Sequence, residues 1–312
     1  MFRPYLKWIL AVLLFVLPFA VSDFNLYYVN RSLIYIILAV GLNIAMGYTG
    51  FVHLGFAALA GVGAYGTAGL MLQLGFPYLA AVLGGGLIAA AVGLLLAIPA
   101  VRLQLLGFAL VTFAFGAVAQ LIIRQVPFLA AEGMLMFPRA SVGPVSLDGN
   151  FRLFFVIYPI TVALFILFVN IMKSRTGRAF IALADNPAAA QAMGINLHRY
   201  GILAFVVSAF YAGIAGGLLA PQLTVLDSGF FGVAETILVV MMLVVGGNGT
   251  FVGPVLGAVF LSFLPEFIRS FVQYRLLVYG GIVVLFVIFM PQGIGGQIRI
   301  WWDQRTRRVT GT

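Results

Sequence analysis

The chain of 312 residues contains no cysteine, only two histidines and few charged side chains. The lack of cysteine excludes disulfides, thiolate nucleophiles and cysteine-ligated metals. His53 lies in an apolar segment and His198 in a polar loop, so we expect neither a metal site nor a Ser-His-Asp arrangement. Lys7 and Lys173 are the only lysines, and neither follows a glycine-rich phosphate-binding loop. We therefore expect no enzymatic activity, no cofactor and no ATP hydrolysis by this chain itself.

Charged residues make up 8% of the chain and hydrophobic residues 63%, with a mean hydropathy of +1.14. Soluble domains contain about 25% charged residues, so this chain cannot cover a globule with polar surface. Its apolar runs of roughly 16 to 24 residues fit the ~20 residues that cross a bilayer as a helix. The runs are continuous rather than alternating, which favours helices over a barrel. We predict an all-α, polytopic transmembrane helical bundle forming a single domain over residues 1–312.

The apolar segments can be placed from hydropathy alone. We predict about ten of them, at residues 8–22, 32–48, 52–73, 77–99, 103–123, 153–172, 200–221, 231–246, 252–272 and 276–290. The first resembles a signal peptide, but it lacks a convincing small-x-small cleavage site. We therefore expect it to be retained as a span.

The distribution of Lys and Arg predicts the orientation in the membrane. A cytoplasmic N-terminus places most of the 17 Lys and Arg residues on the cytoplasmic side, as the positive-inside bias requires. Both termini and the loop 173–199 are then cytoplasmic, and the loop 124–152 is external. This bias also accounts for the net charge of +9, so we expect no nucleic-acid partner. The basic tail 291–312 is expected to lie near anionic membrane lipid.

The two long loops differ in character. The external loop carries several prolines and glycines and is expected to be irregular, with room for a short surface helix. In the cytoplasmic loop, Asn186 suits an N-cap, Pro187 the first helical position and Gly194 a C-terminal stop. We predict a short amphipathic helix there. Its small residues favour a docking element; the alternative is an ordinary positively charged linker.

Glycine is abundant, with 37 residues, and its placement is informative. Two runs, Gly47–Gly50 and Gly246–Thr250, are expected to interrupt helices. Broken helices at corresponding places in two halves of a transporter indicate its substrate path. Tight helix packing is the alternative for most glycines, and the spacings of Gly246/Gly249 and Gly253/Gly257 suit it. The candidate pathway residues are Asn43, Gly47, Gly50, His53, Gly55, Gly246, Gly247 and Gly249.

A few polar side chains fall within the apolar segments, where they are costly and should face the bundle interior. They are Asn43, His53, Gln120, Ser208, Glu235 and Glu266. His53 follows the first glycine break and is the favoured pathway residue. The alternative is an imidazole hydrogen-bonded to a neighbouring helix. Glu235 and Glu266 are interpreted as boundary charges without a function.

Three blocks together resemble a known family. They are "GLNIAMGYTGFVHLGFAALAGVGAY", "TGRAFIALADNPAAAQAMGINLHRYGILAFVVSAFYAGIAGGLLA" and "VVGGNGTFVGPVLGA". The chain resembles the permease subunits of ATP-binding-cassette (ABC) importers for branched-chain amino acids, LivM type, from about residue 30 to 290. The resemblance implies a LivH-like second permease, two cytoplasmic ABC ATPase subunits and an extracytoplasmic substrate-binding protein, all acting at the cell inner membrane.

In this family the loop equivalent to 173–199 engages the ATPase. Ala189, Ala190 and Gly194 match the E-A-A-x-x-x-G element of binding-protein-dependent permeases, whereas Ala188 stands where Glu is usual. The resemblance therefore implies a coupling role for one set of residues. These are Gly177, Arg178, Asp185, Asn186, Pro187, Ala189, Ala190 and Gly194.

The chain also departs from the family pattern. His53 and Phe56 stand where Ser and His are usual, Ala184 and Pro187 where Arg and Glu are common, and "FLAAEG" (128–133) where many members have T-G-G-x-x-G. The expected cargo is a branched-chain or other hydrophobic amino acid. The alternatives are urea, short amides or another small organic solute. An ion-coupled secondary transporter is disfavoured because the sequence lacks paired intramembrane carboxylates.

Overall fold

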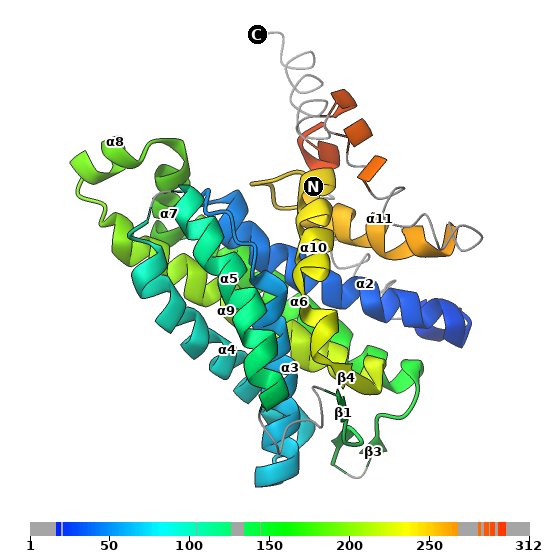
Figure 1. Ribbon diagram of the computed structural model, residues 1–312. Coiled ribbons are helices and arrows are strands. Elements are labelled where there is room, and N and C mark those ends of the chain that lie inside the picture. The colour runs from blue at the N-terminus through cyan, green and yellow to red at the C-terminus, as the bar shows by residue number, and fades with distance from the viewer. Residues whose placement is uncertain are drawn as a thin grey trace.

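The computed structural model describes residues 17–19, 21–103, 105–125, 134–143 and 145–267, and short pieces at 280–281, 284–286, 288–290 and 293–297. Helices form most of this part of the chain (Figure 1). The helical elements are η1 (Leu17–Phe19), α2 (Asp23–Leu42), the π-helical η2 (Asn43–Gly47), α3 (Phe56–Leu74), α4 (Tyr78–Ala100), α5 (Leu105–Gln125), α6 (Asn150–Lys173), α7 (Arg175–Asp185), α8 (Pro187–Ala192), α9 (Leu197–Leu223), η3 (Ser228–Phe231), α10 (Val233–Gly246) and α11 (Gly253–Phe267). The strands are β1 (Met134–Met136), β2 (Ser141–Val142), β3 (Val145–Ser146) and β4 (Val225–Asp227).

Six helices are long and apolar enough to cross a membrane, and α10 and α11 are shorter apolar helices. The six are Asp23–Gly47, Phe56–Leu74, Tyr78–Ala100, Leu106–Gln125, Asn150–Lys173 and Leu197–Leu223. Between residues 32 and 267, each predicted segment overlaps a helix, and the last residues of segment 252–272 lie outside the described part of the chain. Segment 8–22 lies largely outside the described residues, as do parts of 276–290, so the predicted count of about ten is not established. "FLAAEG" and residues 298–312 of the basic tail also lie outside them.

The two long loops lie at opposite ends of α6 (Figure 1). At one end, the strand end, β1 pairs antiparallel with β4 so that Met134 faces Asp227 and Met136 faces Val225, and β2 pairs with β3. The other end, the α8 end, carries α7 and α8. Part of the loop that was expected to be irregular forms short paired strands, and residues 134–143 and 145–149 contain no surface helix. The extended chain there satisfies its backbone groups through strand pairing instead.

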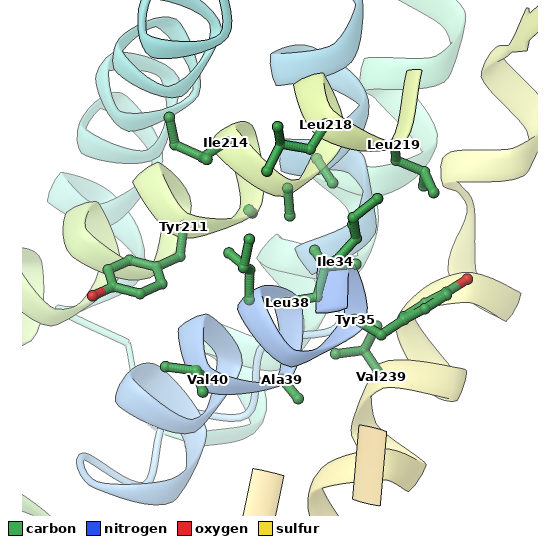
Figure 2. Close-up of a cluster of buried hydrophobic side chains, with 14 of the residues drawn as sticks. Ile34, Tyr35, Leu38, Ala39, Val40, Tyr211, Ile214, Leu218, Leu219 and Val239 are labelled. Atoms are coloured by element: carbon green, nitrogen blue, oxygen red, sulfur yellow. The ribbon is translucent and has the colours of Figure 1, made fainter. Parts of the chain in front are cut away.

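The core of the bundle is built around α2. Figure 2 shows Ile34, Tyr35 and Leu38 of α2 between side chains of α9, such as Leu218, and Val239 of α10. In the apolar stretch of α2 and η2, 83% is buried within the protein, whereas 28% of the corresponding stretch of α5 is buried. A helix that is hydrophobic all round and enclosed by other helices is a central one. The chain therefore holds α2 at its centre and exposes α5 to lipid or to a partner.

Glycines allow two pairs of helices to approach closely, α3 with α9 and α10 with α11. A Cβ atom at Gly216 of α9 would overlap the carbonyl oxygen of Ala60 in α3, and one at Gly63 would overlap the backbone of Gly213. Similarly, a Cβ atom at Gly257 of α11 would overlap the carbonyl oxygen of Met242 in α10. Such contacts require glycine, because the neighbouring atoms belong to backbone that cannot turn away. The packing interpretation is thereby confirmed for these crossings.

Candidate functional site

The segment after α6 turns sharply into α7. The Ser174 hydroxyl oxygen accepts a hydrogen bond from the Thr176 N–H at 3.2 Å and caps α7. Gly177 fits there because a Cβ atom would overlap the backbone of Met172 in α6. Phe180 and Leu183 are buried, whereas Arg175, Arg178 and Asp185 are exposed. One face of α7 is thus fixed to the bundle and the other carries charge.

The short helix predicted after Asn186-Pro187 is confirmed as α8. The Asn186 side-chain oxygen accepts from the Ala189 N–H at 3.0 Å, and Pro187 is the first helical residue. Gly194 ends the turn with a positive φ of 84°, where its N–H donates to the Gln191 carbonyl at 3.0 Å. Such a left-handed residue after a helix favours glycine.

Little of α8 touches the bundle. Only Ala190 of the helix is buried, and the Met193 side chain that follows it is 84% exposed. Residues 175–194 are hereafter called the α7–α8 element. It consists of one anchored helix and one exposed, rigidly capped helix at its tip.

The two predicted glycine breaks meet each other. The Asn43 side-chain oxygen accepts from the Gly249 N–H at 2.9 Å, and its NH₂ group donates to the Thr250 carbonyl at 2.9 Å. A Cβ atom at Gly47 would overlap the Asn43 side-chain oxygen and lie 2.8 Å from the Gly249 nitrogen. We call this contact between residues 43–50 and 246–253 the break junction.

The second break is an ordered turn rather than a loose one. Gly247 and Gly249 have positive φ values of 116° and 68°. The Thr250 hydroxyl donates to the Gly247 carbonyl at 2.8 Å and accepts from the Gly253 N–H at 3.0 Å. Thr250 therefore closes the turn and helps to start α11. The sequence reasoning assigned Thr250 no role, although a threonine three residues before a helix start is a recognisable capping signal.

The break junction lies beside the α7–α8 element. A Cβ atom at Gly50 would come within 3.9 Å of Cα and Cβ of Ala184 in α7. The rings of Tyr48 and Phe251, one from each break, lie 6.1 Å apart, and both also contact Phe168 of α6. Irregular backbone of this kind is tolerated in a membrane protein where it is enclosed by protein. The broken segments and the exposed α8 therefore belong to the same end of the molecule.

His53 and Gly55 face other helices. The His53 ring stacks on Phe205 of α9 at 4.5 Å between centroids and meets the edges of Phe56 and Phe108. Its side chain is fully buried, and neither ring nitrogen has a hydrogen-bond partner among the described residues. The alternative of an imidazole hydrogen-bonded to a neighbouring helix is thus wrong there. Gly55 packs against the Thr112 carbonyl of α5.

Comparison with known proteins places this arrangement in a family. The profile of the family described as "Branched-chain amino acid transport system / permease component" matches residues 25–290, which include the break junction and the α7–α8 element. The chain belongs to this family.

The permease is similar to LivM over most of its length and to BraD and LivH over about half of it. It is 31% identical to the high-affinity branched-chain amino acid transport system permease protein LivM of Escherichia coli K12, over 91% of this chain and 73% of that protein. It is 30% identical to BraD of Pseudomonas aeruginosa over 56% of this chain and 65% of that protein. It is also 30% identical to LivH of Escherichia coli K12, over 46% of this chain and 47% of that protein. No solved structure gives a significant match. The permease is a multi-pass membrane protein.

The permease also contains a polar network that the sequence reasoning missed. Tyr35 of α2 donates to the Glu235 carboxylate of α10 and accepts from the Arg31 guanidinium at 3.1 Å. Arg31 also donates to the Tyr27 hydroxyl at 3.4 Å. Glu235 therefore joins two helices, and its interpretation as a plain boundary charge was incomplete. The spacing of Tyr27, Arg31 and Tyr35, four residues apart on one helix, was the available signal.

Replacing His53 by leucine should stabilise the permease, and its effect on transport tests the predicted pathway role. A buried polar group without a partner costs about 1–3 kcal/mol, and leucine removes both ring nitrogens from the aromatic enclosure. The midpoint of thermal unfolding in detergent is therefore expected to rise. If His53 takes part in the pathway, the uptake rate falls despite the gain in stability. Unchanged uptake would return His53 to a packing role.

The matched control is Phe108→Leu, which alters the same enclosure but removes no polar atom. It should lower the unfolding midpoint, because it only loses buried aromatic surface. A lower midpoint for His53→Leu as well would contradict the argument from unpaired nitrogens.

Proposed function

We propose that this permease is the membrane-spanning subunit of an ABC importer that carries branched-chain or other hydrophobic amino acids across the cell inner membrane. Its partners would be a LivH-like permease, two cytoplasmic ATPase subunits and an extracytoplasmic binding protein. ATP hydrolysis would take place in the partner subunits, and the chain itself would be a conduit. The cargo follows from the names of the relatives and from the apolar character of the bundle.

The observation that carries this proposal is the α7–α8 element. α8 is a capped helix that exposes nearly all of its surface at the end of a membrane bundle, as expected for a helix that binds another protein. In a cleft of an ATPase subunit, such a helix can receive a rigid-body movement. Fixed to α6 by the close approach at Gly177, α7 can pass that movement to the spans.

The orientation that this function requires has support from charge. Among the described residues, the α8 end carries a group of cations with Asp185 as the acidic residue beside them. The cations are Arg102, Lys173, Arg175, Arg178 and Arg199. The strand end carries fewer cations and more acidic residues, including Asp23, Asp148 and Asp227. The positive-inside bias favours a cytoplasmic α8 end.

A second candidate cargo is a small polar organic solute such as urea or a short amide. It is favoured by the departures from the family pattern at His53 and Phe56, which lie together in one aromatic enclosure. The membrane role and the partners would be the same, and only the solute chosen by the binding protein would differ.

Reconstitution tests the proposed function directly. The complex of this permease with its second permease and ATPases should accumulate radiolabelled L-leucine in proteoliposomes when ATP and the binding protein are supplied. A complex assembled without this chain is the control and should not transport. Leucine uptake that needs an ion gradient but no ATP would overturn the ABC mechanism. ATP-driven uptake of urea but not leucine would favour the second cargo.

A further inference from the structure

The Asn43 side chain links two helix breaks that are far apart in the sequence. It is fully buried, and its amide group makes one hydrogen bond as an acceptor and one as a donor, to the adjacent residues Gly249 and Thr250. Backbone groups at a break have no partner within their own helix and must find one elsewhere. Asn43 supplies both partners at once, so the second break is held by the end of α2.

Gly47 allows this link to form. With any side chain at position 47, the Cβ atom would occupy the place of the Asn43 side-chain oxygen. The Gly47 carbonyl also lies 3.2 Å from the position of a Cβ atom at Gly249. The two backbones thus approach each other closely, and the fit leaves little freedom for one break to move without the other.

The turn that follows η2 lies beside the α7–α8 element. A Cβ atom placed on Gly50 would come within 3.9 Å of Ala184, in the last turn of α7, whose Phe180 and Leu183 are buried in the bundle. Because the two backbones are neighbours there, we expect a displacement of α7 to reach the first break at Gly50. From there, the described residues offer a continuous route through Asn43 to the turn between α10 and α11.

We propose that Asn43 is a positioning residue that makes both helix breaks move together when the α7–α8 element moves. This inference rests on the proposed function, in which that element receives its movement from an ATPase. Asn43 then contacts neither the cargo nor the nucleotide. Without its two hydrogen bonds, the first break would still follow α7, but the turn between α10 and α11 would not follow the first break.

The test compares two buried asparagines of the same helix. Asn43→Leu removes the link at the α8 end. Asn30→Leu is the matched control, because Asn30 is also fully buried and donates to the Asn150 carbonyl at 2.8 Å near the strand end. Each complex is reconstituted with its ATPases and binding protein, and leucine uptake and ATP hydrolysis are measured in the same vesicles.

For Asn43→Leu we expect about tenfold less leucine transported per ATP hydrolysed, which is within the usual range of coupling between sites. For Asn30→Leu the ratio should stay unchanged even if both rates fall. Equal losses of uptake and hydrolysis in Asn43→Leu would overturn the inference and leave Asn43 a merely structural role. A wild-type complex without ATP-driven leucine uptake would instead contradict the proposed function.

A second variant guards against a failure to fold. Gly47→Ala keeps Asn43 but displaces its side-chain oxygen from Gly249, so it should lower the same ratio. If neither variant yields folded protein while Asn30→Leu does, Asn43 is required for assembly of the bundle and the inference is wrong.

Discussion

Gly216→Ala is expected to prevent most of the permease from reaching its folded state. In an ordinary helix this change would be favourable by about 1 kcal/mol, because alanine has the higher helix propensity. Here the new methyl group would overlap the carbonyl oxygen of Ala60, so α9 and α3 would have to separate. Overpacking against rigid neighbours costs about 3 kcal/mol or more, which is a large share of the stability of a typical domain. The measurement is the folded, monodisperse yield in detergent and the midpoint of thermal unfolding.

Gly116→Ala is the matched control for this prediction. Gly116 is also a buried glycine within a transmembrane helix, α5, but a Cβ atom there would meet only Cα of Gly55, at an ordinary 3.5 Å. Its yield should equal that of the wild type and its midpoint should be the same or higher. If the two variants behave alike, the close crossing of α3 and α9 does not limit folding.

Local features of the fold could be predicted from the sequence. Continuous apolar runs located the helices, and Asn186, Pro187 and Gly194 defined α8 because capping depends on neighbours in the sequence. The runs at Gly47–Gly50 and Gly246–Thr250 were recognised as breaks for the same reason. What these features share is that each is decided within a few residues.

The contacts between distant segments could not be predicted. The second half of α2 is apolar on every side, so its sequence does not reveal which face meets α9 and which meets α10. Nothing local indicates that Asn43 binds Gly249, or that Met134–Met136 pairs with Val225–Asp227. The role of Tyr35 between Arg31 and Glu235 also depends on two helices meeting. A single sequence does not reveal which distant segments contact each other.

Gly194→Val is expected to abolish ATP-driven uptake while leaving the permease folded and inserted. Gly194 has a positive φ of 84°, which costs a side chain roughly 1–2 kcal/mol and a β-branched one more. Its surroundings are open, since no atom lies within 4 Å of a Cβ placed there. The strain therefore affects only the end of α8. It distorts the surface of the exposed helix to which the ATPase subunit would bind. Leucine uptake and co-purification of the ATPase subunits with the permease report the loss.

Gly75→Val separates docking from backbone strain. Gly75 ends α3 with a φ of 63°, is exposed, and likewise has no atom within 4 Å of an added Cβ, but it belongs to the strand end. Both variants should lose a similar amount of stability, and only Gly194→Val should lose uptake.

The side of the membrane on which α8 lies can be checked with Met193→Cys, because the chain has no natural cysteine. Position 193 is 84% exposed, so the new cysteine should react with membrane-impermeant reagents only from the cytoplasm. Labelling from outside the cell would place α8 out of reach of any ATPase, and the loss of uptake in Gly194→Val would need another cause.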